Sequence, residues 1–417
     1  METLAYPLNT TPINPPLSSA LQARIARDFQ ARWDKDWGGR FVLHGRQPGP
    51  DAVRLDGNDY LAVTGHPDIV RAHVNALTRD SEFVVQSGVF LLQQHPSRAL
   101  EASLAHWVGK EDALICQSGY SANVGLLQAI ADAQTPVYLD GQAHASLWEG
   151  AHAARAPAHM FRHNDPDFLD RMMTRKGPGV VVVDSVYSTT GDVCPLAEMV
   201  EVVEKHGAML LVDESHSLGT HGPAGAGLCA QLGLTDRVHF ITASLAKAMA
   251  GRAGFFTMPA SMRYYILSSS FPNIFSSCLL PHEIAGLQAT VGVLQRADAQ
   301  RSRLFEVTHR VRGALEALGY PIGQGTEQII ALEAGSEPDT MRLRDALESR
   351  GVFGAIFCAP ATARNRALVR LTLNAALTDA EIEHLIAVAA DIAPLVRPWD
   401  WPAARRQRLH EGAIQAS

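Results

Sequence analysis

The middle of this 417-residue chain alternates short, continuous apolar runs with segments of helical periodicity. The run at 180–183 consists of valine alone, which is typical of a strand buried on both faces. Strands that alternate with helices predict a mostly parallel sheet with right-handed crossovers, and therefore an α/β fold. Strands are predicted at 113–116, 137–140, 180–186, 209–213, 238–242 and 254–258, with helices at 97–108, 121–133, 196–205 and 262–269.

Three regions are predicted along the chain. Residues 1–50 form an N-terminal arm with one helix, at 18–37, and residues 51–290 form a large domain that contains the sheet. Residues 291–417 form a smaller C-terminal α/β domain, which a long helical region at 280–318 leads into. Further strand and helix patterns follow at 328–332, 340–350, 352–357, 369–374 and 379–393.

Composition narrows the possible classes of function. The net charge of −7 is spread without long runs of one sign, which argues against a nucleic-acid surface. No stretch approaches the ~20 apolar residues of a membrane span, and the N-terminus lacks a basic segment followed by an apolar one. We therefore expect a cytoplasmic protein. The five cysteines form no CxxC pair and the 17 histidines no HExxH motif, so no metal site is expected.

Two ionisable residues stand beside apolar runs in the predicted sheet. Asp213 ends the run Met209-Leu-Leu-Val-Asp213, and Lys247 follows the next run along the chain. An enzyme that uses pyridoxal phosphate (PLP) needs such a pair, because a lysine amine forms a Schiff base with the cofactor aldehyde and an aspartate keeps the pyridine nitrogen protonated. A solvated loop lysine and an aspartate that caps a strand end would look the same.

Two further segments suit the phosphate of that cofactor. The segment Gln117-Ser-Gly-Tyr-Ser-Ala-Asn123 follows a strand and opens a helix, where free backbone N–H groups and the helix dipole favour an anion. Gly119 would permit close approach, although a simple helix cap explains the same residues. Ser244, three residues before Lys247, can offer a hydroxyl to the same phosphate.

Three other side chains suit the cofactor ring. His144 follows the predicted strand at 137–140, where an imidazole can stack on the pyridine face, although a loop or core histidine is the common alternative. Ser188 and His216 follow two neighbouring strands and can reach the phenolic oxygen. An acid and a histidine beside one ring would fix its protonation state.

The order of these segments resembles the α-oxoamine synthases, which are fold-type I PLP-dependent transferases that join an amino acid to an acyl-CoA. The resemblance spans about residues 50–395 and rests on Ser118-Gly-Tyr120, His144-Ala-Ser146, Ser188-Thr-Thr-Gly-Asp192, Asp213-Glu-Ser-His216 and Lys247. It implies a catalytic set of Lys247, His144, Asp213 and His216. It also implies cofactor contacts from Ser118, Gly119, Tyr120, Ser188, Ser244 and Ser277.

The resemblance further implies how substrates and subunits are arranged. Asn58, in Asn58-Asp-Tyr-Leu61, matches an N-terminal motif of the family, and Arg370 matches the arginine that binds the substrate carboxylate. Ser277, in Phe275-Ser-Ser-Cys278, matches a segment that reaches the phosphate in the partner subunit. A homodimer with shared active sites is therefore implied.

Finer details resemble one branch of the family, the cholera-type synthases of α-hydroxyketone quorum-sensing autoinducers. The matching segments are at 147–151, 184–188, 213–223 and 351–354. Alanines at 246 and 248 replace the usual glycines beside the lysine, and the apolar stretch Val89-Phe-Leu-Leu92 replaces a small-residue stretch. Both departures disfavour a biotin-pathway or 5-aminolevulinate enzyme. Phe90, Leu91 and Leu92 would line an acyl tunnel or be ordinary core.

The reaction implied is the condensation of an amino acid, or S-adenosylmethionine, with a medium-chain acyl-CoA. CoA and carbon dioxide leave, and the product is an α-aminoketone precursor of an autoinducer. Alternatives are another α-oxoamine synthase, such as 8-amino-7-oxononanoate synthase, and a PLP aminotransferase. A non-catalytic relative would be expected to lack the lysine or the aspartate, and both are present.

Overall fold

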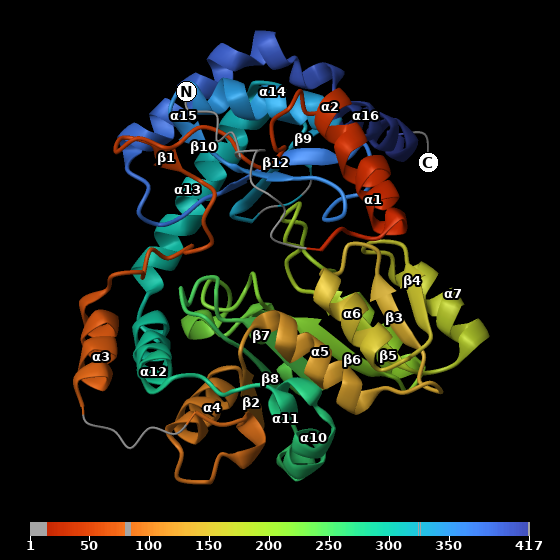
Figure 1. The fold of residues 1–417 in the computed structure, drawn as a ribbon, viewed down its shortest axis with the longest axis vertical. Helices are drawn as coiled ribbons and strands as arrows, with labels where there is room; N and C mark the ends of the chain where they lie inside the picture. Colours follow the sequence, from red (N-terminus) through yellow and green to blue (C-terminus); the bar gives the residue numbers. More distant parts are fainter. Residues whose placement is uncertain (1–14, 80–84, 324, 326, 416–417) are drawn as a thin grey trace.

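The computed structural model describes residues 15–79, 85–323, 325 and 327–415, which form two lobes (Figure 1). Helix α13 (Asp298–Ala317) runs from one lobe to the other. Its Leu304 packs in a core cluster of the larger lobe, whereas Val307, Val311 and Leu315 pack in the core of the smaller one. One continuous helix therefore links the two cores.

The larger lobe is built on a seven-stranded sheet with the order β2-β8-β7-β6-β5-β3-β4. Strand β8 pairs antiparallel with β2 and β7, and the other neighbouring pairs are parallel. This confirms the predicted α/β class and its mostly parallel sheet. The strands are β2 (Asp112–Cys116), β3 (Val137–Asp140), β4 (Ala158–Phe161), β5 (Val180–Asp184), β6 (Met209–Asp213), β7 (Phe240–Ser244) and β8 (Gly254–Met258).

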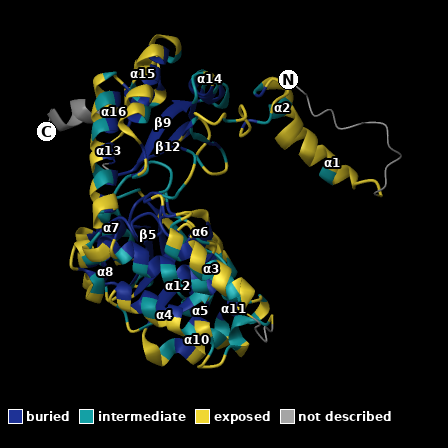
Figure 2. Ribbon diagram, turned by 90° about the vertical axis from the view of Figure 1, so that its left-hand side faces the viewer, coloured by how far each residue is buried: buried dark blue, intermediate teal, exposed yellow. Residues whose placement is uncertain are grey.

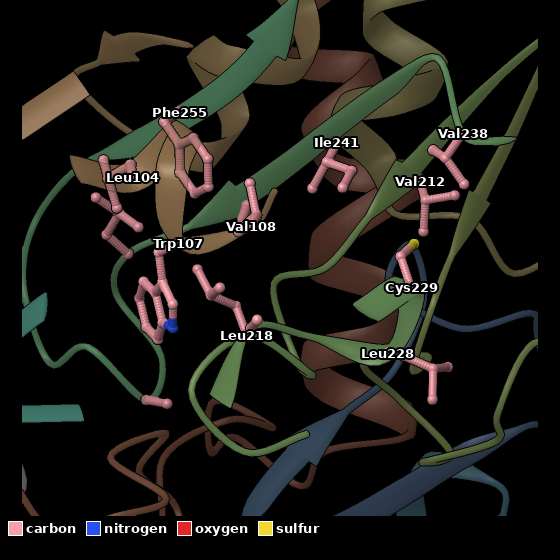
Figure 3. Packing of buried hydrophobic residues seen from close by; sticks show 14 of the residues in the cluster. Leu104, Trp107, Val108, Val212, Leu218, Leu228, Cys229, Val238, Ile241 and Phe255 are labelled. Atoms are coloured by element: carbon pink, nitrogen blue, oxygen red, sulfur yellow. The ribbon is translucent and has the colours of Figure 1, made fainter. Parts of the chain in front are cut away.

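Helices cover both faces of this sheet, so the valine run in β5 is buried on both sides. Val181 and Val183 belong to one core cluster, and Val180 and Val182 to another. Figure 3 shows part of the first cluster, which includes Leu104, Trp107 and Phe255. The helices of this lobe are α3 (Pro67–Thr78), α4 (Pro96–Trp107), α5 (Gly119–Ile130), α6 (Ala145–Ala153), α7 (Pro166–Lys176), α8 (Leu196–Lys205), α9 (Leu228–Gln231), α10 (Arg263–Ser269), α11 (Phe271–Phe275) and α12 (Pro281–Gln295).

The smaller lobe holds an antiparallel sheet of β9 (Ile329–Gly335), β12 (Ala367–Thr372) and β11 (Ala355–Phe357). Beside it, β1 (Val53–Arg54) pairs with β10 (Val352–Phe353) in parallel. Trp37, Val42, Val53 and Leu55 pack in this lobe's core, so an N-terminal segment joins the C-terminal strands. The domain boundaries near 50 and 290 stay a prediction. Three helices complete the lobe: α14 (Glu337–Glu348), α15 (Asp379–Val396) and α16 (Pro402–Gln415).

The predicted N-terminal helix forms in three pieces, α1 (Ser19–Ile25), a π-helical stretch (Ala26–Gln30) and α2 (Ala31–Lys35). Ser18 caps it, because its hydroxyl accepts a hydrogen bond from the Leu21 N–H. None of the three pieces contains a buried residue, and Figure 2 shows α1 standing away from the rest of the chain. Residues 1–14 of the predicted arm lie outside the described residues.

Candidate active site

A cavity of about 730 Å³ lies where the large sheet faces the smaller lobe. Its walls include the carboxyl ends of β5 and β6 and the β12 strand, as expected of a site beyond the strand ends of an α/β sheet. Most of the predicted site residues line it, although they come from positions far apart in the chain. These are Asn58, Gly119, His144, Ser188, Asp213, His216, Ser244, Lys247 and Arg370.

The carboxylate of Asp213 is held by hydrogen bonds on both oxygens. Its Oδ2 accepts from Asn123 Nδ2 at 2.8 Å, and its Oδ1 accepts from the Ser215 backbone N–H at 2.9 Å. Asp213 is buried at the end of β6. Two directional partners fix the carboxylate in one orientation toward the cavity, so it is prepared to meet a cationic N–H group.

His144 is tied to the same network. It caps α6, because its Nδ1 accepts from the Ser146 backbone N–H, and the Ser146 hydroxyl also lies 2.7 Å from Nδ1. That hydroxyl accepts from Asn123 Nδ2 at 2.8 Å. Burial lowers the pKa of His144, and Lys247 lowers it further while Asp213 opposes the change. The ring is therefore held neutral and fixed, with Nδ1 as the acceptor.

Lys247 lies three residues after the end of β7, in a turn that Ser244 helps to close. Burial lowers the pKa of its amine, and the positive charge of Arg370 lowers it further. Asp213 acts in the opposite direction. A depressed pKa leaves more of the amine neutral near physiological pH, which is the form that acts as a nucleophile or a base.

His216 is buried and paired with Tyr60. The Tyr60 hydroxyl lies 2.6 Å from His216 Nδ1, which leaves Nε2 as the second ring nitrogen. Burial, followed by the charges of Lys247 and Arg370, holds the pKa of His216 well below its usual value. Burial also raises the pKa of Tyr60, so the pair consists of a phenol and a neutral imidazole.

Arg370 projects from β12 and is fixed by three contacts. Its Nη1 donates to the Ser188 carbonyl at 2.8 Å, and its Nη2 donates to Asn58 Oδ1 at 3.1 Å. Its guanidinium also lies 4.4 Å from the centre of the Phe357 ring. None of these contacts is a carboxylate, so the charge of Arg370 remains available to an anionic ligand.

Gly119 brings the start of α5 against the end of β7. A Cβ at this position would lie 2.6 Å from the Ser244 Cβ, so no other residue fits without a shift. The first N–H groups of a helix have no intrahelical partner. This close approach therefore places free donors and the Ser244 residue in the same cavity wall, which suits a phosphate.

Three predicted site residues lie outside the cavity wall. Ser118 is the N-cap of α5, where its hydroxyl accepts from the Ser121 N–H at 3.1 Å, so the simple cap interpretation describes its contact in this chain. Tyr120 is 48% exposed. Ser277 is exposed and pairs through a single β-bridge with Ser87, and its carbonyl accepts from Gln117 Nε2.

Several polar atoms in the cavity wall are buried without a hydrogen-bond partner among the described residues. They are Asn123 Oδ1, Asp184 Oδ1 and Arg370 Nε. Burial raises the pKa of Asp184 well above its usual value, and the nearby Asp213 and Asp140 raise it further. Buried polar groups are normally satisfied, so unpaired atoms in one wall indicate a polar ligand.

Sequence reasoning missed several residues of this wall. Asn123 stands one helical turn after Gly119, so the spacing could have placed both on one face of α5. Ser215 follows Asp213 by two positions and accepts from the Ser244 N–H at 2.7 Å. Glu333 and Arg366 gave no local signal, because they come from the small sheet and from the turn before β12.

Two other kinds of feature are absent from the parts of the chain that the structure describes. No group of three or more histidine, cysteine, aspartate or glutamate side chains there is arranged to hold a metal ion. No described helix is long and apolar enough to cross a membrane.

Comparison with known proteins places this cavity in a family. Residues 50–388 match the family of class I and II aminotransferases. The CAI-1 autoinducer synthase of Vibrio campbellii is 43% identical over 379 residues, which is 91% of this chain and 96% of that protein. An 8-amino-7-oxononanoate synthase of Anaeromyxobacter dehalogenans is 33% identical, over 86% of this chain and 91% of its own length.

Solved structures show the same fold. The serine palmitoyltransferase of Sphingomonas wittichii has a TM-score of 0.82 and 26% identity, and covers 92% of this chain and 99% of its own. A high-resolution structure of SPT with PLP has a TM-score of 0.81 and 27% identity, over 91% of this chain and 99% of that one. The chain therefore belongs to the class I and II aminotransferase family, as a fold-type I, PLP-dependent acyltransferase of the α-oxoamine synthase group.

Proposed function

We propose that this enzyme condenses an amino acid, or S-adenosylmethionine, with a medium-chain acyl-CoA in the cytoplasm. CoA and carbon dioxide are released, and the product is an α-aminoketone that serves as precursor of a quorum-sensing autoinducer. One observation carries the proposal: Lys247, Asp213 and Arg370 line the same cavity. The similarity to the CAI-1 autoinducer synthase over 91% of the chain supports the choice of branch.

The residues present fit the PLP of the family. The start of α5 and Ser244 suit its phosphate, Asp213 suits the pyridine nitrogen, and His144 suits one face of the ring. The unpaired buried atoms of Asn123 and Asp184 are further polar contacts for a bound group. When bound, the cofactor supplies an aldehyde for amine exchange and an electron sink for a carbanion.

Lys247 would act as the base that removes the substrate Cα proton, since its amine is buried and its pKa is lowered. Asp213 would keep a proton on the pyridine nitrogen of the cofactor. Hydrogen bonds fix both of its carboxylate oxygens, so the negative charge is held in one position. His216 and Ser188 would contact the phenolic oxygen of the cofactor, and the neutral His144 would stack on one face of its ring.

Arg370 would hold the amino-acid carboxylate. Its Nε is buried and unpaired, and its other nitrogens are anchored by Ser188 and Asn58. A planar guanidinium fixed in this way offers two parallel donors to a carboxylate. Because Lys247 lines the same cavity, a substrate whose carboxylate binds Arg370 would lie within reach of the base.

The donor and acceptor are tested together by a mass-spectrometric screen of amino acids against acyl-CoA thioesters. We expect CoA release that depends on the amino acid, with an α-aminoketone as product. Formation of a keto acid without a thioester would identify an aminotransferase instead. A product formed from pimeloyl-CoA in preference to octanoyl- or decanoyl-CoA would identify an 8-amino-7-oxononanoate synthase.

The apolar part of the cavity wall favours an uncharged acyl chain. Trp148, Val186, Phe357 and Leu368 contribute to it. Each buried methylene adds about 0.8 kcal/mol, so four more carbons would improve kcat/KM by roughly a hundredfold until the space ends. Phe90 and Leu92, expected in an acyl tunnel or in the core, are 64% and 73% exposed and do not line the cavity of a single chain.

We also propose that two copies of the chain form the active enzyme. Phe90 and Leu92 are exposed, and the turn that holds Phe90 (Gly88–Phe90) contacts α11, which carries the exposed Phe271 and Phe275. Exposed apolar residues gathered on one face mark an interaction site. Ser277 stands on this same face and not in its own cavity, which suits a residue that completes the site of a second copy.

Mixed dimers test the sharing of sites. Lys247→Ala and Ser277→Asp chains would each be inactive as homodimers, and a mixture would regain about a quarter of the wild-type activity per chain if half of the dimers are hybrids. A mixture no more active than either parent would contradict shared sites. Two different affinity tags on the variant chains allow the hybrid to be isolated, and sedimentation confirms that it is a dimer.

A further inference from the structure

A buried carboxylate at the cavity joins two arginines from separate elements. Glu333, on β9, is buried and lines the cavity. Arg366 donates to it through Nε and Nη2, the latter at 2.9 Å, and also lines the cavity. Arg406, on α16, donates to the other side of the same carboxylate. The three side chains tie α16 to the small sheet at the edge of the proposed active site.

This cluster carries one net positive charge and faces water on one side. The side chains of Arg366 and Arg406 are 43% and 45% exposed, whereas that of Glu333 is 8% exposed. The carboxylate therefore lies behind the two guanidinium groups and aligns them. Neither Arg366 Nη1 nor Arg406 Nη1 has a hydrogen-bond partner among the described residues.

Neutralising a buried carboxylate requires one guanidinium, and the chain supplies two. Helix α16, which brings the second, lies beyond residues 50–388 that match the family. Paired arginines with free outer edges are suited to phosphate, because each planar fork can make two parallel hydrogen bonds to its oxygens. A partly exposed site of this kind also attracts a highly charged ligand from solution.

We propose that Arg366 and Arg406, aligned by Glu333, bind phosphate groups on the carrier that delivers the acyl chain. The proposal rests on the acyl-transfer function proposed above and assigns it a carrier site. The thioester must reach Lys247, inside the same cavity that Arg366 lines, while the anionic part of the carrier stays in water. Coenzyme A and a protein-bound phosphopantetheine arm share this phosphate chemistry.

A series of three decanoyl thioesters separates phosphate recognition from recognition of the acyl chain. Decanoyl-pantetheine has no phosphate, decanoyl-phosphopantetheine has one, and decanoyl-CoA has a diphosphate and a further phosphate on the ribose. The kcat/KM of each is measured for the wild type and for Arg406→Ala and Arg366→Ala. Arg310→Ala is the matched control, because Arg310 pairs with Asp379 and Glu383 and does not line the cavity.

We expect the ratio of kcat/KM for decanoyl-CoA to that for decanoyl-pantetheine to fall at least about tenfold in each variant, mainly through KM. The control should leave the ratio unchanged. If the same ratio for decanoyl-phosphopantetheine fell as much as the ratio for decanoyl-CoA, the site would be assigned to the pantetheine phosphate. A fall confined to decanoyl-CoA would assign it to the nucleotide phosphates.

An unchanged ratio in both variants would overturn the proposal, and so would a parallel loss for all three thioesters. Calorimetry of the PLP-loaded wild type with adenosine 3′,5′-bisphosphate and with phosphopantetheine provides a test that does not depend on turnover. Binding of either probe that weakens in Arg406→Ala would support the phosphate site even if no thioester were a substrate. If neither probe bound and the kcat/KM ratio were unchanged, the proposed phosphate site would be refuted.

Discussion

The two walls of the cavity differ in how their charged groups are held. On the large-sheet wall, Asp213 and His144 are fixed by a shared network through Asn123, and burial lowers the pKa of Lys247. On the small-lobe wall, Arg370 is anchored by a carbonyl and an amide oxygen, and no carboxylate neutralises it. The first wall suits proton transfer, and the second suits the recognition of anions.

This difference assigns separate tasks to separate elements. Groups on the large sheet come from the ends of strands that are fixed by packing on both faces of the sheet. They can therefore hold the cofactor ring and the proposed base in fixed relative positions. Arg366 and Arg370, on the small lobe, are the groups proposed to bind substrates, which enter and leave in each turnover. Changes on the first wall should therefore reduce kcat, and changes on the second should raise KM.

The largest expected effect comes from Lys247→Ala. Loss of the amine removes both the proposed Schiff-base link to the cofactor and the proposed base, so kcat should fall by at least about a thousandfold. The visible absorbance of the PLP-loaded enzyme should change as well. Lys205→Ala is the control, since Lys205 is exposed on α8 and pairs with Asp170. Retention of both absorbance and turnover in Lys247→Ala would show that another lysine reacts.

On the opposite wall, Arg370→Lys should raise the KM of the amino acid by about tenfold or more. The charge remains, but the planar fork and its anchors to Ser188 and Asn58 are lost. The kcat at saturating amino acid should change much less. Steady-state kinetics with the amino acid varied measures both, and Arg310→Lys controls for the general effect of the exchange. An unchanged KM would move the carboxylate contact elsewhere.

A smaller effect is expected from Gly119→Ala, at the contact between α5 and β7. The new Cβ would lie 2.8 Å from the Ser244 Cα, so the helix start must shift, at a cost of about 1–3 kcal/mol. PLP affinity should fall together with stability. Gly313→Ala is the matched helical control: no atom lies within 4 Å of its Cβ, and the change should stabilise α13 by up to about 1 kcal/mol. If Gly119→Ala and Gly313→Ala had the same stability and the same PLP affinity, the close contact at Gly119 would be refuted.

A pH-dependent effect is expected in the loops after β3, β4 and β5, where His163 lies between Asp140 and Asp192. Burial alone would lower the pKa of His163, but hydrogen bonds to Asp140 and Asp192 raise it to about 9. Because the folded-state pKa lies above the usual 6.5, this stabilisation is complete below pH 6.5 and is lost as pH rises through about 9.

His163→Gln should therefore flatten the fall in unfolding free energy between those two pH values. Urea unfolding below pH 6.5 and above pH 9 measures it. His106→Gln, at an exposed site on α4, is the control. A slope in His163→Gln equal to that of the wild type would show that the histidine does not hold its proton between the two acids.

The sequence predicted the first wall better than the second. Asp213 and Lys247 could be found because continuous apolar runs mark buried strands, and ligands bind where such strands end. Long helical patterns were harder to divide: the expected segment 280–318 forms α12 and α13, which break at Arg296 and Ala297. Helices α3, α6, α7, α9, α11 and α16 and strands β1 and β4 were missed.

The roles predicted for Ser118 and Tyr120 stay predictions, because a local pattern does not decide them. Ser118 and Tyr120 were placed at the phosphate from a helix-start pattern, which cannot tell which residues of the first turn face a cavity. Glu333, Arg366 and Arg406 meet only through the fold, since more than one element separates each of them in the chain. Nothing in their sequence neighbourhoods indicates that they share a contact.

Exchange of the substrate Cα proton with solvent tests the division between the two walls most directly. It is measured in deuterated buffer with saturating amino acid and no acyl donor, for Asp213→Asn and Arg370→Lys. We predict that Asp213→Asn slows exchange by at least about a hundredfold, whereas Arg370→Lys remains within a fewfold of the wild type. Near-normal exchange in Asp213→Asn, or an equal loss in both variants, would contradict the account.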